Sequence, residues 1–250
     1  AAIVFNNQDG NFGGALSTES TIPAVSLSGD QGRALLALLE LGEVMAKVSV
    51  ETRTLQSRNV VAVKPGPPGD DGQVVLGGHY DTVAGTSGAN DNGSGIATVL
   101  TIARAIADRS YPFTVRFILF GSEELGLRGS SDYVRGLSDE QRAATLAMLN
   151  FDALGTGDTL GVLGESELAL AALSVGRELG IRSARRRFSG ANLSSDHAPF
   201  NEAGIPTVFF LADDISRIHT PEDKLEFVRP ELLGGSAVLG IALLAVLSEG

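Results

Sequence analysis

No cysteine occurs among the 250 residues of this chain, so it can form neither a disulfide scaffold nor a thiolate zinc site, and it has no cysteine nucleophile. A metal site in this protein must therefore use histidine, aspartate or glutamate side chains. Basic residues are also scarce: 19 lysines and arginines stand against 30 aspartates and glutamates, and the formal net charge is -11. Because nucleic-acid binding depends on positive charge, this balance predicts no nucleic-acid partner.

Long hydrophobic runs and two common enzyme motifs are missing as well. The longest uncharged stretch, residues 232–248, is shorter than the roughly 20 apolar residues that span a bilayer, and Gly234 and Gly235 interrupt it. We therefore expect a buried C-terminal helix and no membrane partner. The serine-hydrolase pattern G-x-S-x-G and the phosphate-binding pattern G-x-x-x-x-G-K-[ST] do not occur, which argues against those two classes of enzyme.

From Arg58 onward, continuous apolar strands alternate with helices. This pattern is typical of an α/β fold in which helices cover both faces of a mixed, mostly parallel sheet. The predicted strands are residues 59–63, 74–78, 114–120, 146–151 and 206–211, and the predicted helices are residues 95–107, 167–179 and 230–247. The run of prolines and glycines at 65–72 predicts a hairpin turn between the first two strands.

Residues 1–57 have a different pattern and are expected to form a small N-terminal lobe. Apolar strands are predicted at residues 2–5 and 22–27. A helix is expected after Ser28, because its hydroxyl can accept a hydrogen bond from a free N–H of the first turn. Apolar and polar residues alternate over 44–55, which predicts a further strand that closes the lobe.

Acidic and histidine side chains follow the predicted strands of the larger domain or lie in the loops beyond them. These residues are His79, Asp81, Asp91, Glu123, Glu124, Asp152 and His219. Open α/β sheets bind their ligands at the carboxyl ends of the strands, and the ends of parallel strands meet at one edge of the sheet. We therefore expect these two imidazoles and five carboxylates to converge.

Crowded carboxylates repel one another, so such a cluster is tolerable mainly when cations neutralise it. The negative charges of Asp91, Glu124 and Asp152, together with a hydroxide, balance two Zn²⁺ ions if both histidines are neutral. Mixed imidazole and carboxylate ligands suit zinc, whereas an all-oxygen set would favour magnesium or calcium. Asp81 lies two residues beyond His79 and is better placed to orient this histidine than to bind metal.

Six short motifs carry these side chains. They are Gly77-Gly-His-Tyr-Asp81, Gly88-Ala-Asn-Asp-Asn-Gly-Ser-Gly95, Gly121-Ser-Glu-Glu-Leu-Gly126, Asn150-Phe-Asp152, Ser195-Asp-His-Ala-Pro-Phe200 and His219-Thr-Pro-Glu-Asp223. In this order they resemble the co-catalytic di-zinc aminopeptidases, a family whose relatives include the glutamate carboxypeptidases. The resemblance implies a metal-dependent exopeptidase with peptide substrates. It favours an aminopeptidase that hydrolyses N-terminal residues with a zinc-activated water.

The resemblance also implies a role for each site residue. The implied metal ligands are Asp91 as the bridge between two zinc ions, His79 and Asp152 at one ion, and Glu124 and His219 at the other. Glu123 is implied to be the general base that takes a proton from the attacking water, and Asp81 supports His79 in the catalytic set. The peptide bond between Asp91 and Asn92 is implied to be cis.

The N-terminal lobe resembles the second half of a protease-associated domain, which some members of the family carry. This resemblance divides the chain into a partial protease-associated-like lobe at 1–57 and a zinc peptidase domain at 58–250. The family resemblance also implies a secreted or cell-envelope location.

One position departs from the family pattern. Some members place a tyrosine, which stabilises the oxyanion, immediately before the last histidine ligand, and here Ile218 stands in that position. The role of the tyrosine therefore does not carry over to this chain.

Two alternatives stay open: a one-zinc acyltransferase that resembles glutaminyl cyclases, and a non-catalytic binding module that keeps the peptidase fold. The third histidine, His197, is expected to have a packing or capping role.

Overall fold

The computed structural model describes residues 1–10, 20–51, 55–69, 72–164, 167–186 and 194–249. The chain divides into two compact units, residues 1–56 and residues 57–250.

The larger unit is built on a mixed sheet of seven strands, which confirms the predicted α/β class. The strands, in spatial order, are β3 (Val60–Lys64), β5 (Thr114–Phe120), β4 (Gln73–His79), β6 (Thr145–Phe151), β9 (Thr207–Ala212), β7 (Leu160–Leu163) and β8 (Ser183–Arg185). The four neighbours β5, β4, β6 and β9 run parallel, and so do β7 and β8. The pairs β3–β5 and β7–β9 are antiparallel.

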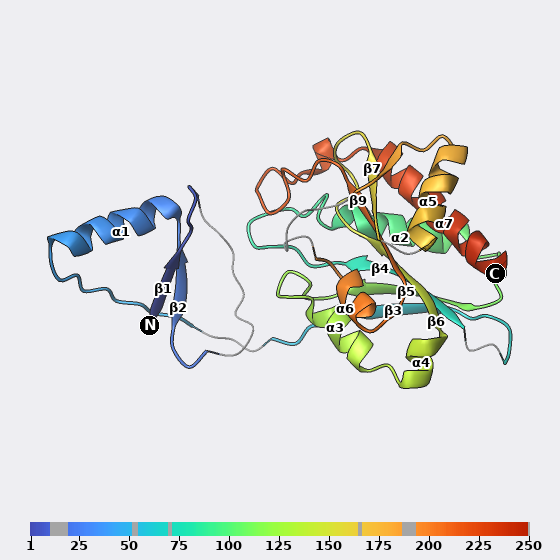
Figure 1. Ribbon diagram of the computed structural model, residues 1–250, viewed down its shortest axis with the longest axis horizontal. Helices are drawn as coiled ribbons and strands as arrows, with labels where there is room; N and C mark the ends of the chain where they lie inside the picture. The colour runs from blue at the N-terminus through green and yellow to red at the C-terminus, as the bar shows by residue number, and fades with distance from the viewer. Residues whose placement is uncertain (11–19, 52–54, 70–71, 165–166, 187–193, 250) are drawn as a thin grey trace. The chain divides into compact units, whose positions relative to one another are not determined.

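Helices cover both faces of this sheet (Figure 1). One face carries α2 (Gly93–Ala105), α5 (Glu167–Glu178) and α7 (Pro230–Glu249), and the other carries α3 (Arg128–Arg135), α4 (Asp139–Ala144) and α6 (His197–Glu202). In β4, Val74 and Leu76 belong to the hydrophobic core beneath the first group of helices, whereas Val75 belongs to the core beneath the second. Both faces of β4 are buried, and its residues 74–78 carry no polar side chain, which explains the continuous apolar run of the sequence.

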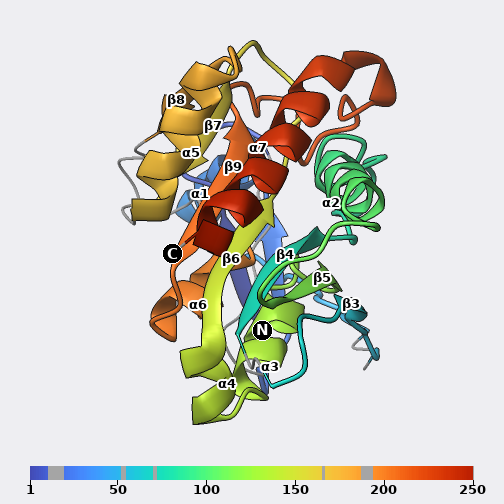
Figure 2. The ribbon, with the colours of Figure 1, turned by 90° about the vertical axis from the view of Figure 1, so that its right-hand side faces the viewer.

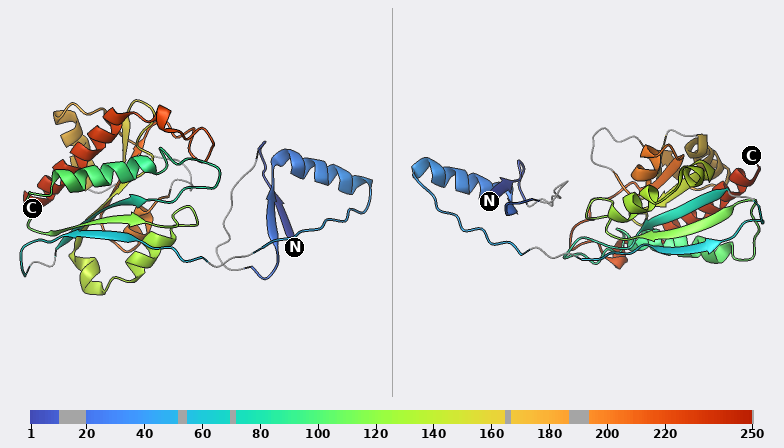
Figure 3. Two further views of the ribbon diagram at one scale, coloured as in Figure 1. Left: turned by 180° about the vertical axis from the view of Figure 1, so that it is seen from behind. Right: turned by 90° about the horizontal axis from the view of Figure 1, so that it is seen from below.

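The C-terminal helix α7 is part of this core. By length and hydropathy alone it could cross a membrane. Its Leu239, Leu243 and Leu244 have no exposed surface and pack in the core on the first face of the sheet. The helix lies between α5 and α2 in Figure 2, and the left view of Figure 3 shows it beside α2. This is the buried C-terminal helix that the sequence predicts.

Two predictions about strands are wrong. Residues 44–51 and Leu55 form no strand, although apolar and polar residues alternate there, and residues 52–54 lie outside the described part of the chain. The run at 65–72 is not a hairpin turn, because β5 lies between β3 and β4 in the sheet. A strand forms only where another strand satisfies its backbone groups, and a local pattern does not specify that partner.

The smaller unit contains two parallel strands and one helix. Strand β1 (Ala2–Phe5) pairs with β2 (Ala24–Leu27), and α1 (Gly29–Leu41) follows β2 directly. Ser28 caps this helix as predicted, since its hydroxyl accepts a hydrogen bond of 3.2 Å from the N–H of Gln31. The structure also describes the irregular segments on either side of these elements, except for residues 11–19 and 52–54.

Candidate metal centre

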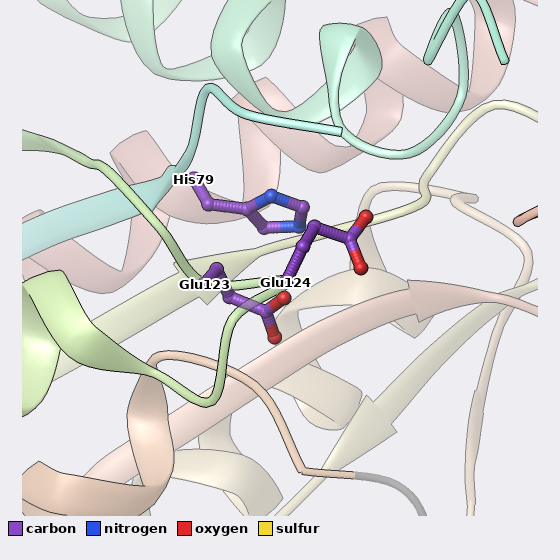
Figure 4. Close-up of side chains that lie close together, drawn as sticks. All are labelled: His79, Glu123 and Glu124. Carbon is purple, nitrogen blue, oxygen red and sulfur yellow. The ribbon is translucent and has the colours of Figure 1, made fainter. Parts of the chain in front are cut away.

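Three parallel strands of the sheet end at the same edge and carry four of the predicted site residues. His79 is the last residue of β4, Asp152 directly follows β6, and Glu123 and Glu124 follow β5. Figure 4 shows His79 at the end of its strand, with the two glutamates close to it. The parallel pairing of β4 with both β5 and β6 therefore accounts for their proximity.

Asp91 lies between the two histidines of the predicted site. Its Oδ1 is 3.1 Å from the Nε2 of His79, and its Oδ2 is 3.0 Å from the Nε2 of His219. Each histidine also faces a second carboxylate: His79 Nε2 lies 3.3 Å from Asp152 Oδ1, and His219 Nε2 lies 3.2 Å from Glu124 Oε2. The five side chains thus form two groups of three that share Asp91.

These two groups fit zinc in composition and spacing. In each group one imidazole nitrogen and two carboxylate oxygens lie within 4.8 Å of one another. The Oε1 of Glu124 is buried and has no hydrogen-bond partner among the described residues. Burying an unpaired carboxylate oxygen is costly unless a cation satisfies it. Imidazole and carboxylate together form a ligand set that suits Zn²⁺.

The electrostatics of the cluster favour positive charge at its centre. The carboxylates of Asp91 and Glu124 raise the pKa of His219 to about 10. Burial acts to lower the pKa of His79, but the surrounding carboxylates, Asp152 above all, outweigh it and raise this pKa. Burial likewise acts to raise the pKa of Asp91, yet the two histidines hold it well below its usual range. Divalent cations would supply the same positive charge when bound.

Glu123 is a partly buried acid beside this cluster. Burial, reinforced by the negative charges of Asp152, Asp196 and Glu124, raises the pKa of Glu123 to about 9. The preceding residue, Ser122, has a left-handed φ of 60°, an uncommon conformation that a residue without glycine's freedom adopts mainly at turns and functional sites. Divalent cations bound at the neighbouring residues would act against this shift and keep the carboxyl group ionised, as a general base must be before it accepts a proton.

Asp81 contacts both His79 and the segment after β5. The Nδ1 of His79 lies 3.0 Å from the backbone carbonyl oxygen of Asp81 and 3.7 Å from its carboxylate. The carboxylate accepts the backbone N–H groups of Glu123 and Glu124, at 3.1 and 3.2 Å. Sequence reasoning anticipates the first contact only. The second ties the end of β4 to the residues that follow β5.

Other supporting side chains lie within the six motifs, but the sequence assigns them no role. The hydroxyl of Ser195 donates a hydrogen bond of 2.7 Å to Asp152 Oδ2 and accepts one of 2.8 Å from the side-chain amide of Asn150. The peptide bond between Asp91 and Asn92 is cis, as the resemblance implies. Membership of a motif was the one signal by which these residues could have been found.

His197 is not among the residues that surround Asp91. Its ring stacks on that of Phe209, with 4.5 Å between the ring centroids, and burial lowers its pKa to about 4. A neutral imidazole stacked on an aromatic ring has the packing role that the sequence predicts.

A small pocket of about 110 Å³ opens beside the cluster. His79, Asp91, Glu123, Asp152 and His219 form its polar side, and Ala153, Phe209, Leu211, Ile215 and Ile218 form its apolar side. None of the described residues that line this pocket is a lysine or an arginine. The pocket therefore combines an apolar wall with negatively charged side chains.

Comparison with known proteins gives similarity to bacterial aminopeptidases. Aminopeptidase YwaD of Bacillus subtilis is 32% identical over 256 residues, which cover 93% of this chain and 54% of that protein. The solved zinc aminopeptidase from Bacillus subtilis superposes with a TM-score of 0.82 at 29% identity, over 97% of this chain and 63% of that one. The aminopeptidase from Aneurinibacillus sp. strain AM-1 gives a TM-score of 0.79 at 30% identity, over 98% and 62%.

The chain spans about half the length of the curated Bacillus relative that it matches. The family model for peptidase family M28 matches residues 59–242, which include the whole cluster around Asp91. From this match, and from the similarity over nearly the whole chain, we conclude that the protein belongs to peptidase family M28.

Proposed function

We propose that this chain is the catalytic part of a zinc-dependent aminopeptidase, which removes N-terminal residues from peptides. The observation that carries the proposal is the position of Asp91 between two histidines, each of which faces a further carboxylate. The relatives from Bacillus subtilis are aminopeptidases and the solved one is a zinc enzyme, which supports this reaction.

The two groups of three side chains suggest two zinc ions. His79, Asp91 and Asp152 would hold one ion, and Asp91, Glu124 and His219 would hold the other. When bound, zinc polarises a carbonyl group and makes water a stronger nucleophile at neutral pH. A one-zinc acyltransferase would leave one of these groups without a cation, so the paired groups favour the peptidase over that alternative.

Glu123 is the proposed general base. Its carboxyl group is next to His79 and Glu124, and Asp81 holds its main chain in place. In this position it takes a proton from the attacking water and then delivers that proton to the amine that leaves when the peptide bond breaks. Cations held beside Glu123 would oppose the effect of burial on its pKa and keep the carboxylate ionised, so that it can accept this proton.

The pocket beside the cluster favours the amino end of a peptide over the carboxyl end. A terminal carboxylate needs a cationic partner, and the described lining contains no lysine or arginine. A terminal ammonium group, by contrast, is attracted by the carboxylates on the polar side of the pocket. The apolar wall then suits an apolar side chain on the N-terminal residue.

We assign residues 1–57 to a partial protease-associated-like lobe and residues 58–250 to the zinc peptidase domain. The parallel pair β1–β2 and the separate compact unit at 1–56 support this division. The similarity to the solved Bacillus subtilis enzyme extends over 97% of the chain and therefore includes part of the small unit.

The proposal is tested by stripping the chain of metal and then adding zinc stepwise. Hydrolysis of leucyl-p-nitroanilide and of leucyl peptides should be lost on stripping and should return with zinc. A matched peptide with an acetylated N-terminus should not be cleaved. Hydrolysis that does not depend on zinc, or equal cleavage of the acetylated peptide, would show that the chain is not a zinc aminopeptidase.

A further inference from the structure

Asp223 is a buried carboxylate that the proposed reaction does not use. It is only 1% exposed. Its Oδ1 accepts the backbone N–H of Asn90 at 2.7 Å, and its Oδ2 accepts the backbone N–H of Asp91 at 3.0 Å. Asp223 also lies four residues after His219 in the chain. One side chain therefore joins the segment of His219 to the backbone of Asp91.

The main chain of Asp223 is itself held on two sides. The hydroxyl of Ser87 donates a hydrogen bond to the backbone carbonyl oxygen of Asp223. The N–H of Asp223 donates a hydrogen bond of 3.1 Å to the carbonyl oxygen of Thr220, the residue after His219. These contacts give the carboxylate a defined position relative to both segments.

His219 depends on the hydrogen bonds of Asp223 for its position more than the ligands at the strand ends do. His79 ends β4 and Asp152 follows β6, so the hydrogen bonds of the sheet position both residues. The segment of His219 belongs to no strand or helix, and the His219 side chain is 54% exposed. Its φ of 59° lies in the left-handed region, which is uncommon for any residue other than glycine.

The other half of the cluster has support of its own. Ser195 donates a hydrogen bond to Asp152, and the side chain of Asn90 accepts the backbone N–H of Gly155 at 2.6 Å. The second of these bonds joins the segment after β6 to the Asp91 segment without Asp223. The loss of Asp223 would therefore leave the His79 and Asp152 side of the cluster largely in place.

We propose that Asp223 is a positioning residue for the second cation position, the group formed by Asp91, Glu124 and His219. The inference rests on the proposed two-zinc function. By holding the N–H groups of Asn90 and Asp91, Asp223 keeps the Asp91 carboxylate at the distance from His219 at which both side chains can bind one ion. Its loss weakens this position far more than the position at His79 and Asp152.

The test is a metal titration of Asp223→Asn. The amide keeps the shape of the side chain, but its NH₂ group faces one of the two backbone N–H donors and cannot accept a hydrogen bond. Titration of the stripped protein with Zn²⁺ by calorimetry, and with Co²⁺ by absorption spectroscopy, gives the affinity of each ion. We expect an unchanged affinity for the ion at His79 and Asp152. The ion at Glu124 and His219 should bind about 10- to 100-fold more weakly, as changes beside metal ligands produce.

Glu222→Gln is the matched control. Glu222 precedes Asp223, and its exposed carboxylate pairs with Lys224 at 3.1 Å. This variant removes one negative charge from the same segment, so both of its ions should bind as in the wild type. If Glu222→Gln weakened the affinity for the second ion as much as Asp223→Asn does, the inference would be overturned, because the loss of one negative charge would then explain the weaker binding.

Ser87→Ala provides a second, milder test that keeps Asp223 itself and remains available if Asp223→Asn does not fold by circular dichroism. We expect it to weaken the second ion by about 2- to 10-fold, the effect of one lost hydrogen bond. Unchanged affinities in the folded variants, equal weakening of both ions, or a wild-type chain that binds a single ion would overturn the inference. Zinc-dependent hydrolysis by the wild type is measured in parallel, so a failure of the proposed function is seen separately.

Discussion

The carboxylate of Asp81 accepts a hydrogen bond of 3.1 Å from the backbone N–H of Glu123, so Asp81, two residues after the end of β4, holds the main chain of the partly buried acid that follows β5. The same carboxylate accepts the N–H of Glu124. The acid proposed as general base and one proposed zinc ligand are therefore positioned by one side chain.

Replacing Asp81 by asparagine should weaken the site without unfolding the protein. The amide cannot accept both N–H groups, so the segment of Glu123 and Glu124 loses one of its two anchors. We expect zinc affinity to fall by about 10- to 100-fold and turnover to fall with it. Zinc titration measures the affinity, hydrolysis of leucyl-p-nitroanilide measures the turnover, and the melting temperature of the stripped protein shows whether the variant stays folded. Wild-type zinc affinity and turnover in Asp81→Asn would contradict this role.

Glu123→Gln separates metal binding from catalysis. The amide keeps the size of the side chain but cannot take up a proton, so turnover should fall by about 10²- to 10⁴-fold at full zinc occupancy. Zinc content by elemental analysis should equal that of the wild type. Glu140→Gln, at an exposed position of α4, is the control and should keep full activity. Near-normal turnover in Glu123→Gln would assign the general base to another group.

His197 should make the protein less stable in acid. Burial against Phe209 lowers its pKa to about 4 in the folded state, whereas the ordinary value is 6.5. Between these values the unfolded chain binds more protons, so this stabilising contribution is complete above about pH 6.5 and is lost as the pH falls toward 4. Melting temperatures of the stripped wild type and His197→Leu, measured from pH 4 to 8, give the difference. The wild type should lose more stability than the variant over this range, and parallel curves would show that His197 does not titrate in this way.

The apolar wall of the pocket should set the preferred N-terminal residue. Ile215 lines this wall beside Leu211, and Ile215→Ala removes apolar surface without adding charge. We expect kcat/KM for leucyl-p-nitroanilide to fall by about 10-fold relative to that for alanyl-p-nitroanilide. The control is Val238→Ala, at an exposed position of α7, which should leave the ratio of the two kcat/KM values unchanged. A ratio that is unchanged in Ile215→Ala would remove this residue from substrate selection.

The sequence by itself determined the class of the fold and the chemistry of the candidate site. Strand β4 is buried on both faces, so its residues 74–78 form a continuous run without polar side chains, and this run predicts the position of the strand. With no cysteine in the chain, a zinc site could only use imidazoles and carboxylates, and these residue types stand at the ends of the predicted strands.

Only the tertiary structure decided which segments are neighbours. β3 pairs with β5 rather than β4, and residues 44–51 stay irregular despite their alternating pattern. Asp223 reaches the N–H of Asp91 across 132 residues of chain, and Ser195 reaches Asp152 across 43. A hydrogen bond between distant segments depends on how the whole chain packs, whereas local periodicity reports only which face of an element is buried.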